Sequence, residues 1–186
     1  GECVQACPTG ALMEKSLLNN TDTVREVYPD KKIESVCPFC GVGCRTEVSV
    51  KENKIVSVDG IQGPANRGKL CVKGRFGMDY VMSSERLTKP LIRRREVKKD
   101  PKCSYQFSDI GKVFREASWE EAMELAASKF VKILNEKGGH ALSGFGSAKG
   151  TNEEAYLFQK FIRQGFGTNN VDHCTRLCHA SSVAAL

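Results

Sequence analysis

Two neighbouring segments in the first third of the chain alternate between hydrophobic and polar residues. Residues 47–50 read EVSV and residues 54–60 read KIVSVDG, with Glu52 and Asn53 in the connection between them. A period of two predicts strands with one buried face, and the short polar connection predicts a β-hairpin.

Further along the chain the pattern changes to helices that alternate with short strands. Ser118 and Glu121 match a capping box ahead of an amphipathic segment that ends at Gly138, and Thr151 with Glu154 match a second one. Residues 140–146, HALSGFG, predict a short strand, and NNVD at 169–172 a brief segment after the second helix. This alternation predicts an α/β sheet domain. The apolar faces of the two helices comprise Ala122, Ala126, Phe130, Ile133 and Leu134, and Ala155, Phe158, Phe161 and Ile162.

The composition is that of a globular domain: of 186 residues, 40% are hydrophobic and 27% charged. No apolar run approaches the roughly 18 residues that span a bilayer, and no signal peptide is recognisable, so we expect no membrane span. Part of the net charge of +6 lies in the basic stretch KPLIRRREVKKDPK at 89–102. That stretch could meet an acidic partner or nucleic acid. Without interleaved aromatic residues or a nucleic-acid motif, we interpret it as a solvated connection and expect no nucleic-acid partner.

Nine cysteines, an odd number, favour metal binding over a closed disulfide framework. Cys37, Cys40 and Cys44 lie in CPFCGVGC, and Cys71 follows in LCVKG, which gives C-x2-C-x3-C-x26-C. Thiolates at this density hold zinc or an iron-sulfur cluster. Three on one glycine-bearing loop plus a distant fourth favour a 4Fe-4S cluster, because structural zinc usually takes two separated pairs. A zinc module stays an alternative.

Cys3 and Cys7, with Pro8 directly after, match the end of the ferredoxin motif C-x2-C-x2-C-x3-C-P. We interpret them as the remnant of a domain with two 4Fe-4S clusters, against the alternative of two unrelated surface thiols. The chain opens inside this motif and stops where the sequence predicts the start of a helix of small residues, so we expect the working protein to be longer.

Three motifs in order, CPFCGVGC, LCVKGRFG and NNVDHCTRLCHASSVAAL, resemble the N-terminal third of the catalytic subunit of formate dehydrogenases that carry molybdopterin guanine dinucleotide. The resemblance implies a ferredoxin remnant with linker at 1–30, a small 4Fe-4S domain with a β-hairpin at 31–90, and the start of an α/β molybdopterin domain at 91–186. It also implies a bis-molybdopterin guanine dinucleotide with Mo or W.

Site residues follow from the same resemblance. Lys73 falls at the lysine that lies between the cluster and the pterin, where a cation would stabilise negative charge. Cys178 falls at the metal ligand and His179 at the neighbouring imidazole, which can carry the proton of formate oxidation. Cys174 competes with Cys178, and the two thiols could also be read as a zinc pair.

The glycine-rich turn GFGSAKG at 144–150 lies between a predicted strand and a predicted helix, a layout that suits phosphate contact. We expect Gly146, Ser147 and Lys149 as cofactor contacts, although such turns are often structural. Cys103 and His140 are interpreted as structural.

The implied reaction is the interconversion of formate and carbon dioxide, with electrons passing by Lys73 to the cluster and then to further 4Fe-4S clusters on the N-terminal side. Expected acceptors are NAD-linked diaphorase or hydrogenase-type subunits, or ferredoxin, in the cytoplasm. A nitrate reductase of the same architecture is a rival, but it typically has Met after the ligand cysteine. A non-catalytic iron-sulfur electron-transfer subunit is a second rival, and the Cys178-His179 pair speaks against it.

Overall fold

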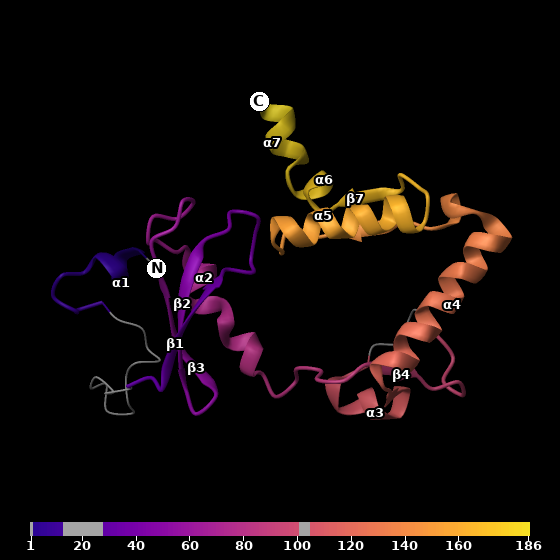
Figure 1. The fold of residues 1–186 in the computed structure, drawn as a ribbon, viewed down its shortest axis with the longest axis horizontal. Helices are drawn as coiled ribbons and strands as arrows, with labels where there is room; N and C mark the ends of the chain where they lie inside the picture. Colours follow the sequence, from indigo (N-terminus) through magenta and orange to yellow (C-terminus); the bar gives the residue numbers. More distant parts are fainter. Residues whose placement is uncertain (1, 13–27, 101–104) are drawn as a thin grey trace. The chain divides into compact units, whose positions relative to one another are not determined.

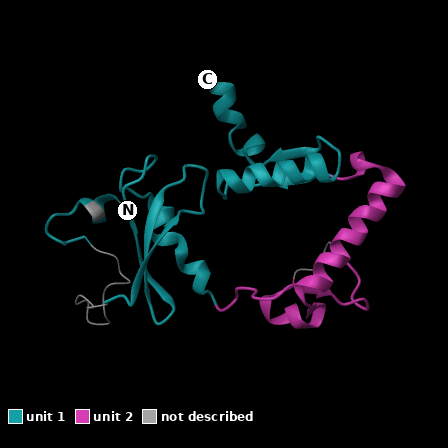
Figure 2. Cartoon of the chain, in the orientation of Figure 1, with its two compact units in different colours: residues 1–83, 143–186 teal, residues 84–142 magenta. Residues whose placement is uncertain are grey.

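A computed structural model describes residues 2–12, 28–100 and 105–186, so Cys103 lies outside the described residues (Figure 1). The chain forms two compact units (Figure 2). Unit 1 combines residues 1–83 with residues 143–186, and unit 2 comprises residues 84–142.

Unit 1 contains a three-stranded antiparallel sheet of β1 (Lys31–Val36), β2 (Arg45–Lys51) and β3 (Lys54–Gly60), in that order. The predicted hairpin between β2 and β3 is confirmed. Glu52 and Asn53 form its turn with φ angles of 49° and 60°. Two left-handed residues give a hairpin turn whose twist matches that of the flanking strands.

One face of this sheet is closed by the segment that follows β3. The short helices α2 (Val72–Phe76) and η2 (Gly77–Met82) contact β3. They enclose a small core around Val58 and Leu70, which are 1% and 2% exposed. The other buried members of this core are Cys37, Phe39 and Met78. Helix α1 (Glu2–Ala6) is tied to the same region, since the Glu2 carboxylate accepts a hydrogen bond of 2.9 Å from the Leu70 amide.

The second part of unit 1 is a small α/β layer. Strands β6 (Gly144–Gly146) and β7 (Val171–His173) pair in parallel, with Gly144 opposite Val171. Between them run α5 (Asn152–Lys160) and the π-helical turn η5 (Phe161–Gly165), and α6 (Thr175–Cys178) and α7 (Ala180–Ala185) follow β7. A parallel pair joined by a helical crossover confirms the predicted α/β class. The turn η5 packs closely against β6, because a Cβ on Gly144 would lie only 2.5 Å from Cγ1 of the buried Ile162.

Unit 2 holds the antiparallel pair β4 (Leu91–Arg93) and β5 (Phe114–Glu116), with η3 (Phe107–Asp109) and α3 (Ile110–Val113) before β5. The long helix α4 (Trp119–Lys137) and the turn η4 (Gly139–Ala141) complete it. The basic stretch is therefore more than a solvated connection: it supplies β4, and the Arg93 guanidinium lies 5.0 Å from the centre of the Phe114 ring.

The predicted strand at residues 140–146 is correct only at its end. Gly138 has a φ of +76°, and the Leu142 amide donates to the Gly139 carbonyl at 3.0 Å, so the chain turns through η4. His140 consequently lies in a helical turn and not at the start of a strand. Throughout the described ranges, no helix combines the length and the apolar character needed to cross a bilayer.

Candidate functional site

The predicted cluster loop connects β1 to β2 and closes on itself. The Cys37 amide donates to the Cys44 carbonyl at 2.9 Å. This bond lies directly beyond Val36 and Arg45, the last residue pair between β1 and β2. Gly43 adopts a φ of +74°, a conformation that residues with a side chain rarely take. Cys37 is buried, while Cys40 and Cys44 are half-buried, so the three thiols are presented from one short, closed loop.

Cys71 comes from a separate segment, at the N-cap of α2. The backbone amides of Gly74, and then of Lys73, lower the pKa of its thiol, and the Lys73 charge acts in the same direction. A Cβ on Gly74 would lie 3.4 Å from the Cys37 sulfur, so this helix also faces the loop. Backbone amides aimed at a sulfur stabilise it as a thiolate ligand.

The Cys44 thiol interacts electrostatically with the other three cysteines of the predicted cluster site. Burial raises the pKa of Cys44, and the charges of Cys37, Cys40 and Cys71 raise it further. Neighbouring thiolates repel, and a bound metal cluster would relieve this repulsion, so the donor set fits the iron-sulfur cofactor. Among the described side chains, no three His, Cys, Asp or Glu residues lie close enough together to hold a single metal ion.

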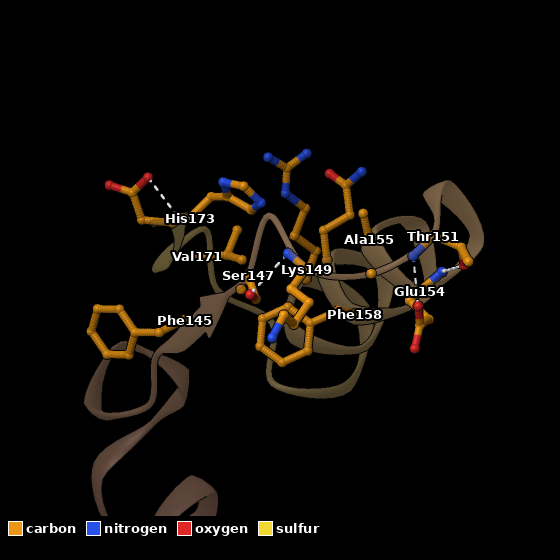
Figure 3. A pocket seen from close by; sticks show the side chains of 14 residues that line it. Phe145, Ser147, Lys149, Thr151, Glu154, Ala155, Phe158, Val171 and His173 are labelled. Atoms are coloured by element: carbon orange, nitrogen blue, oxygen red, sulfur yellow. Dashed lines mark hydrogen bonds between the residues drawn. The ribbon is translucent and has the colours of Figure 1, made fainter. Parts of the chain in front are cut away.

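A cavity of about 520 Å³ lies between the glycine-rich turn, α5 and β7 (Figure 3). The predicted cofactor contacts Gly146, Ser147 and Lys149 all line it. The first half of the GFGSAKG motif is strand β6 itself, and only the second half forms the loop before α5. Thr151 caps that helix with a complete capping box, as predicted.

The charges around this cavity suit an anion. Its cationic side chains are Lys149 and Arg163, and the His173 imidazole also lines it. Both of its carboxylates are engaged elsewhere: Glu154 accepts from the Thr151 amide at 2.6 Å, and Asp172 pairs with Arg176 at 3.0 Å. The sequence interpretation missed Arg163 and His173, because neither belongs to a phosphate-binding motif and only the parallel pairing of β6 with β7 brings His173 beside Gly146.

The glycine-rich turn and the start of α5 also touch the cluster loop, within unit 1. The Asn152 side-chain amide donates to the Gly41 carbonyl at 2.7 Å, and the Lys149 ammonium lies 5.6 Å from the centre of the Phe39 ring. The structure therefore brings together a segment with predicted pterin contacts and the loop of the predicted cluster ligands.

Cys178 and His179 are exposed at the end of α6. Neither is among the fourteen described residues that line the cavity. The competing Cys174 contacts the glycine-rich turn, since its sulfur accepts a hydrogen bond of 3.1 Å from the Ala148 amide. At the other end of the chain, Cys3 lies on α1, and hydrogen bonds, chiefly from the Thr9 hydroxyl, lower the pKa of Cys7 to about 7.

Comparison with known proteins matches nearly the whole chain. The model of the molybdopterin oxidoreductase Fe4S4 domain matches residues 30–83, and that of molybdopterin oxidoreductase matches residues 86–186. A "Putative formate dehydrogenase" of Staphylococcus haemolyticus is 34% identical over 221 aligned positions, which cover 100% of this chain and 21% of that protein. "Probable oxidoreductase YjgC" of Bacillus subtilis is 38% identical with the same coverage. A "Putative formate dehydrogenase" of Staphylococcus aureus strain MRSA252 is again 34% identical, with equal coverage.

The chain spans about a fifth of the length of these curated relatives. The four cysteines of the predicted cluster site lie in the region that the first family model matches, and the cavity lined by Lys149 and Arg163 lies in the region that the second one matches. The chain belongs to the molybdopterin oxidoreductases, with a 4Fe-4S domain followed by a molybdopterin domain.

Proposed function

We propose that this chain is part of the catalytic subunit of a formate dehydrogenase, which oxidises formate to carbon dioxide or runs the reverse reaction. The observation that carries the proposal is the pair Cys178-His179 at the end of α6, a soft thiol ligand followed directly by an imidazole. Two of the relatives described above carry formate dehydrogenase in their names, which supports the same assignment.

Oxidation of a formate ion releases one proton and two electrons along with carbon dioxide. Bound bis-molybdopterin guanine dinucleotide with Mo or W would supply the two-electron acceptor. With that cofactor bound, the Cys178 thiolate would be the residue that holds the metal, and the His179 imidazole would accept the proton released from formate. Gly146, Ser147 and Lys149, which line the cavity, would hold phosphate groups of the cofactor beside the capped start of α5.

The proposed exit for electrons is the four-cysteine site of Cys37, Cys40, Cys44 and Cys71. Lys73 lies next to it, and its charge already acts on Cys71. A cation there stabilises the site when an electron arrives. Cys3 and Cys7 would then ligate further 4Fe-4S clusters that lead to a diaphorase-type or hydrogenase-type subunit, or to ferredoxin, in the cytoplasm.

The test is metal analysis and electron paramagnetic resonance of the anaerobically purified holoprotein, before and after formate is added. We expect Mo or W together with iron, and cluster signals that appear on formate addition. Cys178→Ser should lose formate turnover and the bound Mo or W while keeping the iron. The matched control is Cys174→Ser, whose hydroxyl can still accept from the Ala148 amide, and it should keep both.

Three results would contradict the proposal. Turnover of nitrate but not formate would indicate the nitrate reductase alternative. Iron without Mo or W in protein from its native host would indicate an electron-transfer subunit. Loss of Mo or W in Cys174→Ser but not in Cys178→Ser would assign the metal to the other thiol.

A further inference from the structure

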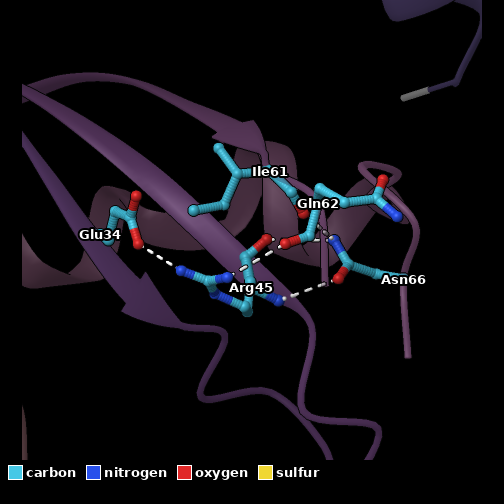
Figure 4. A network of polar contacts seen from close by, with 5 residues as sticks. All are labelled: Glu34, Arg45, Ile61, Gln62 and Asn66. Atoms are coloured by element: carbon cyan, nitrogen blue, oxygen red, sulfur yellow. Dashed lines mark hydrogen bonds and ion pairs between the residues drawn. The ribbon is translucent and has the colours of Figure 1, made fainter. Parts of the chain in front are cut away.

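The loop between β3 and α2 is organised around one buried side chain, Asn66, which is 8% exposed (Figure 4). The two N–H groups of its amide are shared among three carbonyls, those of Arg45, Ile61 and Lys69, with N···O distances of 3.0, 3.2 and 3.0 Å. Its carbonyl oxygen accepts from the Arg45 amide at 3.1 Å. All four partners are backbone groups, so the side chain of Asn66 acts as a bridge between stretches of main chain.

The backbone groups that Asn66 joins flank two predicted cluster ligands. Arg45 directly follows Cys44, and Lys69 lies two residues before Cys71. The Lys69 amide also donates to the Asn66 carbonyl at 2.8 Å, which closes the turn that leads into Cys71. Asn66 thereby connects the cysteine loop to the one ligand that comes from a distant part of the sequence.

The surroundings of Asn66 are shaped to fit it. A Cβ on Gly63 would lie 2.7 Å from the Asn66 side-chain oxygen and 3.0 Å from Cγ of Arg45, so only glycine leaves this space open. The Arg45 guanidinium extends the network by donating to the Gln62 carbonyl at 3.2 Å and by pairing with Glu34 on β1 (Figure 4). The bridge is therefore anchored to both the sheet and the loop.

We propose that Asn66 is a positioning residue that sets the separation of Cys44 and Cys71 and so controls how firmly the iron-sulfur cluster is held. Asn66 does not ligate iron; it acts through the backbone on either side of the ligands. Side chains that orient metal ligands typically change metal affinity by roughly 10-fold to 100-fold when they are replaced. The inference rests on the iron-sulfur domain and not on the formate assignment.

Asn66→Asp in the holoprotein tests this directly. Aspartate has nearly the same shape and keeps the acceptor for the Arg45 amide, but it places a second oxygen against three carbonyl oxygens. We expect iron release to a chelator to be roughly 10-fold faster, and the paramagnetic resonance spectrum and reduction potential of the reduced cluster to shift. Neither measurement needs formate, so the result is independent of the substrate.

Two further variants separate positioning from general stability. Gly63→Ala keeps Asn66 but crowds its side-chain oxygen, and should change iron release and the spectrum in the same direction. Asp30→Ala removes a bond of similar kind at the far end of the sheet, where the Asp30 carboxylate accepts from the Glu52 amide at 2.6 Å. It should lower the unfolding temperature but leave the iron-release rate and the spectrum unchanged.

The proposal is overturned if Asn66→Asp releases iron no faster than the wild type. It is also overturned if Asp30→Ala and Asn66→Asp lower the unfolding temperature equally and release iron at the same rate. If Asn66→Asp does not fold, Gly63→Ala decides the question by the same measurements, and wild-type release rates there count against the proposal.

Discussion

At the scale of single residues, the cluster loop depends on a glycine outside it. Phe39 lies between Cys37 and Cys40, is 9% exposed, and packs edge-on against Tyr80 with the ring centres 6.1 Å apart. A Cβ on Gly77 would lie only 2.7 Å from Cζ of Phe39. The missing side chain of Gly77 therefore makes the space for the ring that supports the loop.

We expect Gly77→Ala to lower the free energy of unfolding by roughly 1–3 kcal/mol, the usual cost of overpacking a core. The φ of Gly77 is −88°, which alanine adopts readily, so the loss would come from the contact with Phe39 and not from backbone strain. Chemical denaturation followed by circular dichroism measures it.

Gly111→Ala is the matched control, since nothing lies within 4 Å of the added Cβ. In a short helix this change should be neutral or stabilising. If Gly77→Ala and Gly111→Ala lose equal amounts of unfolding free energy, the contact with Phe39 is not the cause.

At the scale of elements, the two predicted capping boxes form to different extents. At α5 both halves are present, with Thr151 accepting from the Glu154 amide and Glu154 accepting from the Thr151 amide. At α4, Ser118 accepts from the Glu121 amide at 3.1 Å, but the Glu121 carboxylate pairs with Arg115 on β5. The sequence pattern is the same at both helices, and only the position of β5 decides the difference.

The Glu121–Arg115 pair predicts a pH dependence. The hydrogen bond from Arg115 lowers the pKa of Glu121 below the value of about 4.3 for a free glutamate. A lowered pKa in the folded state stabilises the protein fully above the unfolded value, and this stabilisation is lost as the pH falls through the folded value. Glu121→Gln should therefore unfold at a lower temperature than the wild type near neutral pH, and the gap should close below about pH 4.

Thermal unfolding measured across this pH range checks the prediction. Glu124→Gln, three residues further along α4, makes the same change of side chain without removing the pair with Arg115, and it should lower the unfolding temperature less near neutral pH. If the difference in unfolding temperature between Glu121→Gln and the wild type stays constant into the acid range, the ion pair with Arg115 is not its source.

How far the sequence predicts the elements depends on local signals. The β2–β3 hairpin has clear alternation and a recognisable turn, and its prediction is confirmed. Strand β1 was missed because all six of its residues are exposed, so that no buried face appears as a pattern. The first part of the predicted strand at 140–146 fails because Gly138 diverts the chain into a turn.

In the candidate site as well, the sequence predicts what depends on local spacing and not what depends on distant contacts. Cysteine spacing predicts the cluster loop because its ligands lie within one short segment. Asn66 and Asn152 went unnoticed because a single asparagine in a loop or at the start of a helix looks like an ordinary turn or capping residue. Two of the backbone groups they contact, in Arg45 and Gly41, lie 21 and 111 residues away in the sequence.

At the scale of the whole molecule, the contact of Asn152 with Gly41 joins the two parts of unit 1. A Cβ on Gly41 would lie 2.4 Å from the Asn152 side-chain oxygen, so Gly41→Ala would turn the asparagine away and break its hydrogen bond. Asn152→Ala removes the same bond from the other side. The two substitutions therefore act on one interaction.

We expect each variant to lose about 1 kcal/mol of unfolding free energy, and the double variant to lose little more than either one. A double-mutant cycle by chemical denaturation measures the coupling. Asn152→Ala combined with Gly111→Ala, which lies in unit 2, should instead be additive. Additive losses for Asn152→Ala and Gly41→Ala would show that the contact carries no energy.

The distance of Asn152 from Gly41 along the chain also orders events during synthesis. A ribosome adding about 5–20 residues per second reaches Asn152 roughly 6–22 seconds after Gly41, a separation of 111 residues. During that interval the nascent cysteine loop has no asparagine against its Gly41 carbonyl. The contact between Asn152 and Gly41 can thus form only after all four cysteines of the predicted cluster site, Cys71 included, have been synthesised.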